Sequence, residues 1–307
     1  MVQKTDTIWF DGQLIPWDEA NVHIMTHTLH YGVAVFEGIR CYKCEDGSSA
    51  LFRLGDHIAR LLDSAKIMQM DVPFSHEEVC EAVINTLRAN KIDKGYVRPL
   101  AFIGDGVLGV YPSNNPIHLA IVTTQWGAYL GEDALQKGVK VRTSSFTRHQ
   151  VNSVMTKAKC SGNYVNSVLA KREALGGGYE EALMLDPNGY VAEASGENVF
   201  VVKKSVLKTT PEGSILPGLT RDSIVTLARD MGYQVIERPF TRDEVYIADE
   251  AFFTGTAAEI TPIRDLDHRV IGFGEAGPVT KLLQQEFFRI VHGENLKYAG
   301  WLTHYEL

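Results

Sequence analysis

The sequence predicts an α+β protein with two domains and largely antiparallel sheets. Helical and β-rich runs are mixed along the chain, without the regular strand–helix alternation of a parallel sheet. The 307 residues are enough for two domains of moderate size. A small and polar stretch near the middle is suited to a connection. We therefore expect an N-terminal small domain at 1–127, an interdomain loop at 128–137 and a C-terminal domain at 138–307.

The N-terminal half begins with a hairpin signal, because two apolar-rich runs flank the turn dipeptide Asp11-Gly12. A helix is predicted at 55–68, where apolar residues recur with helical spacing. A second helix is predicted at 76–90. Two β-rich runs, 95–104 and 117–126, follow it.

The C-terminal half mixes strands and helices again. Turn residues separate its β-rich runs, and its helices show an apolar stripe. The predicted strands are 138–146, 181–186, 189–195 and 197–210, and the predicted helices are 162–175, 216–232 and 278–291.

Composition narrows the class of protein. The net charge of −8 and the lack of any basic run argue against binding to nucleic acid or to an anionic membrane. The N-terminus lacks the apolar stretch of a secretion signal, and no window approaches the ~20 apolar residues of a membrane span. We expect a cytoplasmic protein that uses no metal.

The four cysteines are too few and too scattered for a disulfide framework. Cys41 and Cys44 form a C-x-x-C, but the motif leaves a predicted strand for a polar turn and has no second pair nearby. We interpret them as incidental thiols, with a redox-sensitive pair as the alternative.

The stretch G-D-G-V-L-G at 104–109 matches a dinucleotide-binding pattern after a predicted strand. Such a site requires a helix to begin there, so that its N-terminus can hold the pyrophosphate. Two prolines and no periodic apolar face follow instead. We therefore predict a loop shaped by its glycines.

Two lysines, Lys157 and Lys159, stand among small and apolar residues. A buried amine is costly when charged, so its pKa falls and it becomes a usable nucleophile, as in lysines that bind pyridoxal phosphate. Such a cofactor also needs a helix N-terminus and a guanidinium for its phosphate, and a carboxylate for its ring nitrogen. Spacing does not choose between the two lysines. Candidates for the other parts are Thr220 in "LPGLTRD", Arg60, and Glu193 and Glu197 in "EASGEN".

Several motifs in order resemble the bacterial branched-chain amino acid aminotransferases, which are class IV pyridoxal-phosphate enzymes of fold type IV. This fold is also called D-amino acid aminotransferase-like. The resemblance covers essentially the whole chain. The motifs are "HTLHYGVAVFEGIRCY", "GYVRPL", "TQWGAYLG", "AKCSGNYVNS", "EASGENVF", "LPGLTRD" and "FFTGTAAEITPI".

The resemblance implies roles at the cofactor. Lys159 matches the Schiff-base lysine, since it precedes the short stretch that ends in G-N-Y, and Lys157 becomes a flanking residue. Tyr164 would donate to the phenolic oxygen and Glu193 would pair with the ring nitrogen, which leaves Glu197 structural. The residues expected to contact phosphate or ring are Arg60, Gly196, Leu216, Leu219, Thr220 and Thr256.

The resemblance also implies a substrate pocket. Tyr96 and the amides of Ala257 and Ala258 would hold the substrate α-carboxylate, and Arg98 would engage the side-chain carboxylate of glutamate. Tyr31 and Val110 would come from a neighbouring subunit, so we expect at least a homodimer with shared sites. The other residues of the pattern are Phe36, Gly38, Arg40, Trp126 and Tyr129.

The expected reaction is ping-pong transamination of L-leucine, L-isoleucine and L-valine with 2-oxoglutarate, giving branched 2-oxo acids and L-glutamate. Lys159 would move the proton between Cα of the substrate and C4′ of the cofactor. The rivals within the fold are a D-amino acid aminotransferase and an aminodeoxychorismate lyase. A cofactor-free binding or scaffold protein is the rival from another class.

Overall fold

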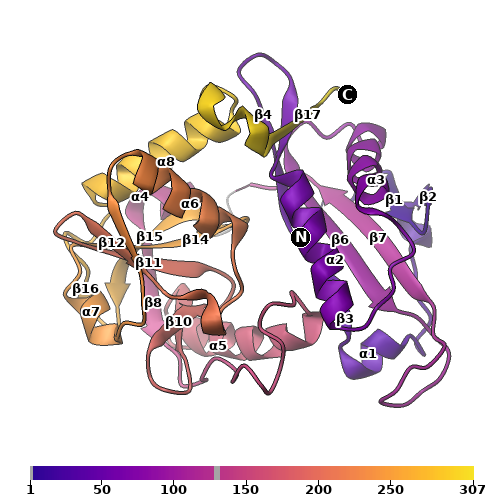
Figure 1. Ribbon diagram of the computed structural model, residues 1–307, viewed down its shortest axis with the longest axis horizontal. Coiled ribbons are helices and arrows are strands. Elements are labelled where there is room, and N and C mark those ends of the chain that lie inside the picture. The colour runs from indigo at the N-terminus through magenta and orange to yellow at the C-terminus, as the bar shows by residue number, and fades with distance from the viewer. Residues whose placement is uncertain (1–2, 128–131) are drawn as a thin grey trace. The chain divides into compact units, whose positions relative to one another are not determined.

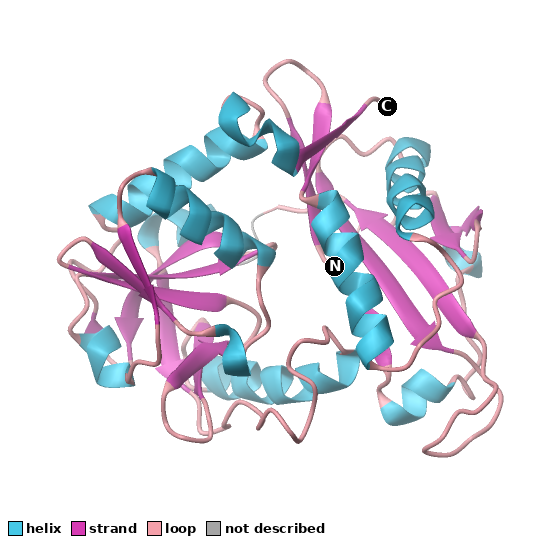
Figure 2. Cartoon of the chain, in the orientation of Figure 1, coloured by secondary structure: helices cyan, strands magenta, loops and turns pink. Residues whose placement is uncertain are grey.

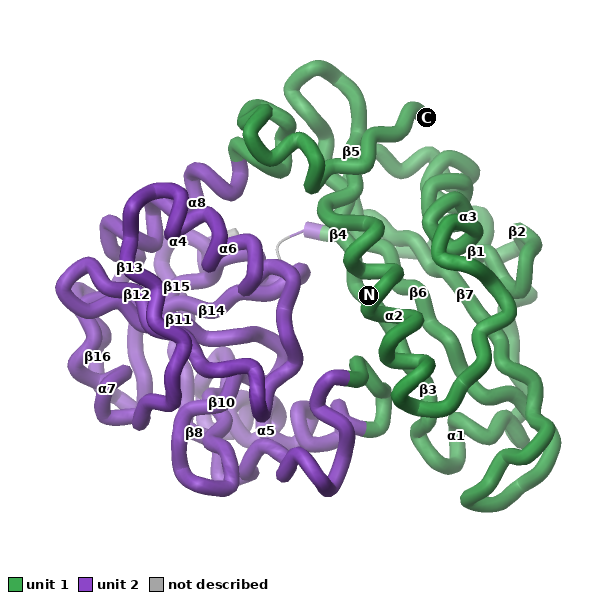
Figure 3. The backbone as a smooth tube through the Cα atoms, in the orientation of Figure 1, with its two compact units in different colours: residues 1–126, 158–162, 289–307 green, residues 127–157, 163–288 purple. Residues whose placement is uncertain are grey.

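The computed structural model describes residues 3–127 and 132–307. The chain divides into two compact units, each with its own sheet (Figure 3). Unit 1 comprises residues 1–126, 158–162 and 289–307, and unit 2 comprises residues 127–157 and 163–288. The predicted ranges place the two last segments of unit 1 in the C-terminal domain. They join unit 1 because both pair with its strands.

The described residues of unit 1 form an eight-stranded sheet in the order β17-β5-β4-β6-β7-β1-β2, with β3 paired to β6. All of its strand pairs are antiparallel. The strands are β1 Thr7–Phe10, β2 Gln13–Pro16, β3 Ala34–Phe36, β4 Ile39–Lys43, β5 Ser49–Phe52, β6 Gly95–Ile103, β7 Ile117–Thr124 and β17 Leu302–Tyr305.

Two long helices of unit 1, α2 (Leu54–Ile67) and α3 (His76–Ala89), pack against each other and against the sheet (Figure 1). Their apolar stripes enter one buried cluster with side chains of the strands. Both helices confirm the periodicity read from the sequence. Ser75 and Glu78 form a capping box at the start of α3, a device that contributes about 1 kcal/mol. The shorter helices are α1 His27–Tyr31, η1 Trp17–Glu19 and η4 Leu296–Trp301.

The predicted hairpin at the N-terminus is confirmed as β1 paired with β2. Asp11 and Gly12 have φ values of 46° and 94°, the left-handed conformation that a tight hairpin turn needs. The stretch 104–109 is a loop between β6 and β7 with no helix after it, as its prolines predicted.

The described residues of unit 2 form a nine-stranded mixed sheet in the order β10-β9-β8-β15-β14-β11-β12-β13, with β16 paired to β15. Parallel pairs occur where β8 meets β9 and β15, and where β12 meets β13. The strands are β8 Val139–Thr143, β9 Glu181–Leu185, β10 Val191–Ala194, β11 Asn198–Lys203, β12 Val206–Thr209, β13 Gln234–Glu237, β14 Glu250–Gly255, β15 Glu259–Leu266 and β16 Arg269–Val270.

Helices and antiparallel-rich sheets are mixed in both units, so the predicted α+β class is confirmed (Figure 2). One helix of unit 2, α4 (Glu132–Lys137), lies in the segment expected to be a loop, where it packs on β15 and buries Ala134. Within the described residues, no helix is long and apolar enough to cross a bilayer. The remaining helices are α5 Tyr164–Gly176, α6 Leu219–Asp230, α7 Arg242–Tyr246, α8 Pro278–Val291, η2 Ser161–Asn163 and η3 Glu212–Ser214.

Candidate active site

The predicted site residues fall into two groups, one in each compact unit. Lys159 belongs to unit 1, although the residues on both sides of its segment belong to unit 2. Its carbonyl accepts from the amide of Phe36 at 3.1 Å, and its amide donates to Ser64 Oγ at 3.0 Å. Cys160 forms a β-bridge with Val35. The backbone that carries the amine is therefore fixed on both sides of the lysine.

The amine of Lys159 lies over an aromatic face, with Nζ 5.0 Å from the centre of the Phe36 ring. The side chain is half-buried. Since Phe36 also bonds the lysine's own carbonyl, β3 sets both the position of the backbone and one wall around the amine. This surrounding favours an amine that reacts rather than one that is merely solvated.

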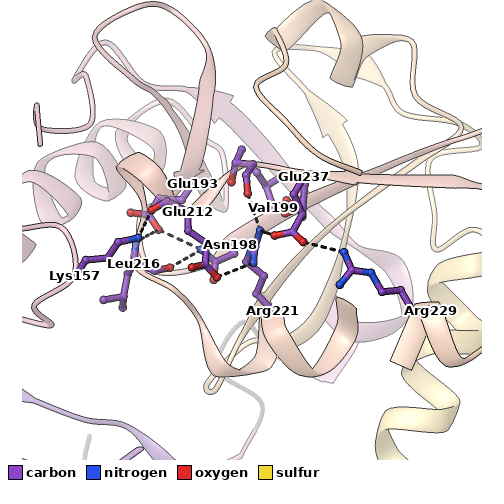
Figure 4. A network of polar contacts seen from close by, with 11 residues as sticks. Lys157, Glu193, Asn198, Val199, Glu212, Leu216, Arg221, Arg229 and Glu237 are labelled. Atoms are coloured by element: carbon purple, nitrogen blue, oxygen red, sulfur yellow. Dashed lines mark hydrogen bonds and ion pairs between the residues drawn. The ribbon is translucent and has the colours of Figure 1, made fainter. Parts of the chain in front are cut away.

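Lys157 has different partners in unit 2. Its Nζ donates to the carbonyl oxygen of Glu212, and its side chain is exposed (Figure 4). Partial burial lowers the pKa of Lys157, although Glu212 and Glu193 act in the opposite direction. The two lysines that spacing left open thus hold different contacts in different units.

Arg60, on α2, is held by a carboxylate that sequence reasoning did not select. Arg60 Nε donates to Glu37 Oε1 at 2.6 Å and Arg60 Nη2 donates to Glu37 Oε2 at 2.9 Å. His57 Nδ1 lies 2.7 Å from Glu37 Oε2. Burial alone would raise the pKa of Glu37, but Arg60 and His57 together hold it well below its usual range. The available signal was a charged residue, Glu37, between the apolar strands at 34–36 and 39–43.

The substrate candidates of unit 1 gather around Tyr96 on β6. Arg98 Nη2 donates to Tyr96 Oη at 3.0 Å, and its guanidinium carbon lies 4.7 Å from the centre of the Phe36 ring. The rings of Tyr96 and Trp126 stack at 5.0 Å. A Cβ at Gly38 would lie 1.8 Å from Tyr96 Oη, so only glycine leaves room for this hydroxyl.

The other pocket candidates of unit 1 lie apart from that cluster. Arg40 is the β-register partner of Tyr96, and its guanidinium carbon lies 5.5 Å from the centre of the Tyr42 ring. Tyr31 is 43% exposed and Val110 is 88% exposed. Such exposed apolar groups suit a role in contact with another chain. Tyr129 lies outside the described residues.

Glu193 on β10 is the centre of the group in unit 2. It is 5% exposed, and its Oε1 lies 2.7 Å from Arg148 Nε. Asn198 Nδ2 and the amide of Leu216 each donate to Glu193 Oε2 at 3.3 Å (Figure 4). Arg148 and Asn198 were missed in the sequence because each is distant from any motif that pointed to cofactor chemistry. Arg148 provides the positive charge that a buried carboxylate requires.

The N-terminus of α6 lies beside this carboxylate. Gly218 is the N-cap, no side chain caps the helix, and a Cβ there would lie 2.0 Å from Asn198 Oδ1. The first N–H groups of any helix have no acceptor within the helix, which makes the end a site for anions. Leu219 begins α6, and Thr220 follows it with 4% exposure. Asn198 Nδ2 also donates to the carbonyl of Leu216 at 3.1 Å, which joins this turn to Glu193.

The remaining candidates of unit 2 occupy turns and a helix start. Gly196 lies in the turn between β10 and β11, and its amide donates to Glu197 Oε2 at 3.1 Å. Burial, with Glu181 and Glu193 nearby, raises the pKa of Glu197 to about 8. Glu197 is therefore neutral at pH 7, unlike a carboxylate that pairs with a cation. Tyr164 begins α5, and Thr256, Ala257 and Ala258 form the turn between β14 and β15.

A family model described as amino-transferase class IV matches residues 34–266, which is well over half of the 307-residue chain. The chain belongs to the class IV aminotransferase family. It is therefore an enzyme of that family. The matched range contains most of the candidates in both units.

Individual members of the aminotransferase family are similar along their whole length. The chain is 52% identical over 303 residues to a branched-chain-amino-acid aminotransferase of Pseudomonas aeruginosa, covering 99% of this chain and 98% of that protein. The crystal structure of the Escherichia coli branched-chain amino acid aminotransferase has a TM-score of 0.95 and 46% identity, covering 97% of this chain and 99% of that one.

A third similar structure is a T.th. branched-chain amino acid aminotransferase complexed with N-(5′-phosphopyridoxyl)-L-glutamate. Its TM-score is 0.94 at 45% identity, covering 98% of each chain. The resemblance to branched-chain aminotransferases and the predicted fold type are thus confirmed.

Proposed function

We propose that this chain is a pyridoxal-phosphate-dependent branched-chain amino acid aminotransferase. It transfers the amino group of L-leucine, L-isoleucine or L-valine to 2-oxoglutarate in two half-reactions, and releases L-glutamate. The observation that supports this most is the anchored Lys159, whose amine faces Phe36 in a chain 52% identical to a protein of that name. The phosphopyridoxyl-glutamate bound to a similar enzyme supports both the cofactor and the glutamate.

The residues present fit this cofactor. An uncapped helix end at Gly218 suits the phosphate, and a buried carboxylate paired with Arg148 suits a protonated ring nitrogen. Bound pyridoxal phosphate supplies an aldehyde that reacts with amines and a ring that accepts electron density. The other residues proposed to hold it are Arg60, Tyr164, Gly196, Leu216, Leu219, Thr220 and Thr256.

Each reacting proton has a candidate carrier in this chain. Lys159 holds the cofactor at rest and then, as a free amine, takes the proton from Cα of the amino acid. Glu193 accepts a hydrogen bond from the ring nitrogen. The Tyr164 hydroxyl donates to the phenolic oxygen of the ring. These roles divide the work between an amine that moves a proton and groups that keep charges fixed.

Substrate choice is proposed to depend on apolar walls with one cation at their rim. Phe36, Trp126, Tyr129 and Tyr164 would contact a branched side chain, and Arg98 would contact the side-chain carboxylate of glutamate. Tyr96 and the amides of Ala257 and Ala258 would hold the α-carboxylate that every substrate shares. Tyr31 and Val110 of a second subunit would complete the pocket, so the working form would be at least a homodimer.

The function is tested by a panel of amino donors, each added alone to the purified protein loaded with pyridoxal phosphate. We expect L-leucine, L-isoleucine, L-valine and L-glutamate to change the absorbance of the cofactor, since each completes a half-reaction. D-alanine and aminodeoxychorismate should leave it unchanged. A response to D-alanine with none to L-leucine would identify a D-amino acid aminotransferase, and release of pyruvate from aminodeoxychorismate would identify a lyase.

Arg98→Ala is expected to raise the KM for L-glutamate by roughly tenfold or more, because a charged hydrogen bond to the substrate is lost. The KM for L-leucine should change less, since leucine has no side-chain charge. Steady-state kinetics with both donors measure the ratio. Arg88→Ala is the matched control, because the guanidinium of this unit 1 arginine bonds the backbone carbonyl of Glu306. Loss of leucine turnover with normal glutamate kinetics would refute this division of the pocket.

A further inference from the structure

Glu37 is a fully buried carboxylate between β3 and β4, with 0% of its surface exposed. Its amide donates to the carbonyl of Pro99 at 2.9 Å, which fixes the backbone against β6. A carboxylate is costly to remove from water unless its charge and lone pairs are compensated. The family match does not assign it a role, and the proposed mechanism does not use it.

The compensation comes from donors that converge on this one group. Arg60 binds it through two parallel hydrogen bonds of 2.6 and 2.9 Å, one to each oxygen. His57 is 1% exposed and its Nδ1 lies 2.7 Å from Oε2. Because a carboxylate only accepts, Nδ1 must carry a proton. The amide of Gly38 donates to the same oxygen at 3.3 Å.

The two-point contact fixes the plane of the Arg60 guanidinium. An arginine on a helix otherwise samples many rotamers, and a ligand that binds it must then restrict them. A paired carboxylate removes that freedom before the ligand arrives. The side chain of Arg60 is 12% exposed, so it reaches the boundary of the buried region rather than open solvent.

Glu37 also stands next to the residues that hold the reactive amine. It follows Phe36, whose amide bonds the carbonyl of Lys159, and precedes Gly38, which makes room for Tyr96 Oη. Burial lowers the pKa of His57, so the histidine is neutral at pH 7 and Glu37 and Arg60 cancel in charge. The cluster is therefore electrically balanced while its geometry is rigid.

We propose that Glu37, supported by His57, is a positioning residue that aims the Arg60 guanidinium at the phosphate of the cofactor. This inference rests on the proposed function, which gives Arg60 that phosphate. Glu37 touches neither phosphate nor substrate. It acts through the arginine.

The test uses two ligands that differ only in the phosphate. Full-length protein is freed of cofactor, and the dissociation constants of pyridoxal 5′-phosphate and of pyridoxal are measured by absorbance for wild type and Glu37→Gln. We expect affinity for the phosphate ester to fall by about tenfold or more, the size of a lost charge-assisted contact. Affinity for pyridoxal should change by no more than about twofold, since it does not use Arg60.

Equal weakening of both ligands would overturn the proposal, because a general loss of structure does not distinguish them. Glu250→Gln is the matched control. Glu250 is also a buried carboxylate, 6% exposed, but its hydrogen bonds go to Val279 and Thr280 at the start of α8. It should change the two affinities by similar small factors.

Two further variants keep the test decisive if Glu37→Gln does not fold. Glu37→Asp retains the charge and should lose less affinity for the phosphate ester than Arg60→Gln does. In the Arg60→Gln background, changing Glu37 to Gln should cause no further loss of that affinity. A further selective loss there would mean that Glu37 acts without the arginine. Wild-type protein that binds neither ligand would instead refute the proposed function itself.

Discussion

Lys159→Ala is expected to abolish transamination and to remove the visible absorbance of the bound cofactor. The side chain supplies both the covalent link and the group that moves the Cα proton, so turnover should fall by roughly 10⁴-fold or more. Its backbone contacts with Phe36 and Ser64 do not involve the side chain, so the fold should persist. Absorbance spectra and single-turnover kinetics with L-leucine measure the two effects.

Lys157→Ala is the matched control, because Lys157 lies two residues away and its amine bonds the carbonyl of Glu212. It should keep the absorbance and most of the activity. Borohydride reduction followed by peptide mapping should then find the cofactor on the fragment that contains Lys159. A label on Lys157, or inactivity of Lys157→Ala with an active Lys159→Ala, would reverse the assignment.

Glu193→Gln should still bind the cofactor, yet slow the proton transfer at Cα by several orders of magnitude. A neutral amide cannot hold a proton on the ring nitrogen, and an unprotonated ring withdraws electron density poorly. The substitution also leaves Arg148, which is 7% exposed, without its counter-charge. We therefore expect a loss of about 3 kcal/mol in the free energy of unfolding as well. Stopped-flow absorbance follows the chemistry, and denaturant unfolding follows the stability.

Glu197→Gln is the matched control, since this carboxyl is four residues away and equally buried. Its pKa of about 8 keeps it protonated at pH 7, so an amide replaces a neutral group and the proton transfer should be nearly unchanged. A raised pKa means that the folded state binds more protons than the unfolded state between pH 4.5 and about 8. Wild type should therefore lose stability relative to this variant as pH rises through that window. Near-normal kinetics for Glu193→Gln would end its assignment to the ring nitrogen.

Local patterns were enough to predict the helices α2, α3 and α6 and the first hairpin. Each depends on residues close in sequence, such as the apolar stripe of 55–68 or the turn at Asp11-Gly12. The helix α4 was missed because its six residues carry too short a stripe to show periodicity. Its stability comes from packing on β15, which only the folded chain reveals.

The candidate site divides in the same way. Motif order pointed to Lys159 and Glu193, but nothing local announces that Arg148 reaches Glu193 or that Glu37 holds Arg60. These pairs join residues separated by 45 and 23 positions, and each depends on how strands and helices pack. Charge balance in a buried cluster is a property of the fold. A sequence pattern lists the acids and bases without telling which of them meet.

The three-part composition of unit 1 affects how the protein is made. Residues 289–307 leave the ribosome after all of unit 2, yet they carry β17, which pairs with β5. The part that is translated first is thus the last to be completed. Until β17 arrives, one side of β5 presents unpaired N–H and C=O groups to the cell, and such an edge is a template for aggregation. A nascent chain that stalls late would be more hazardous than its nearly full length suggests.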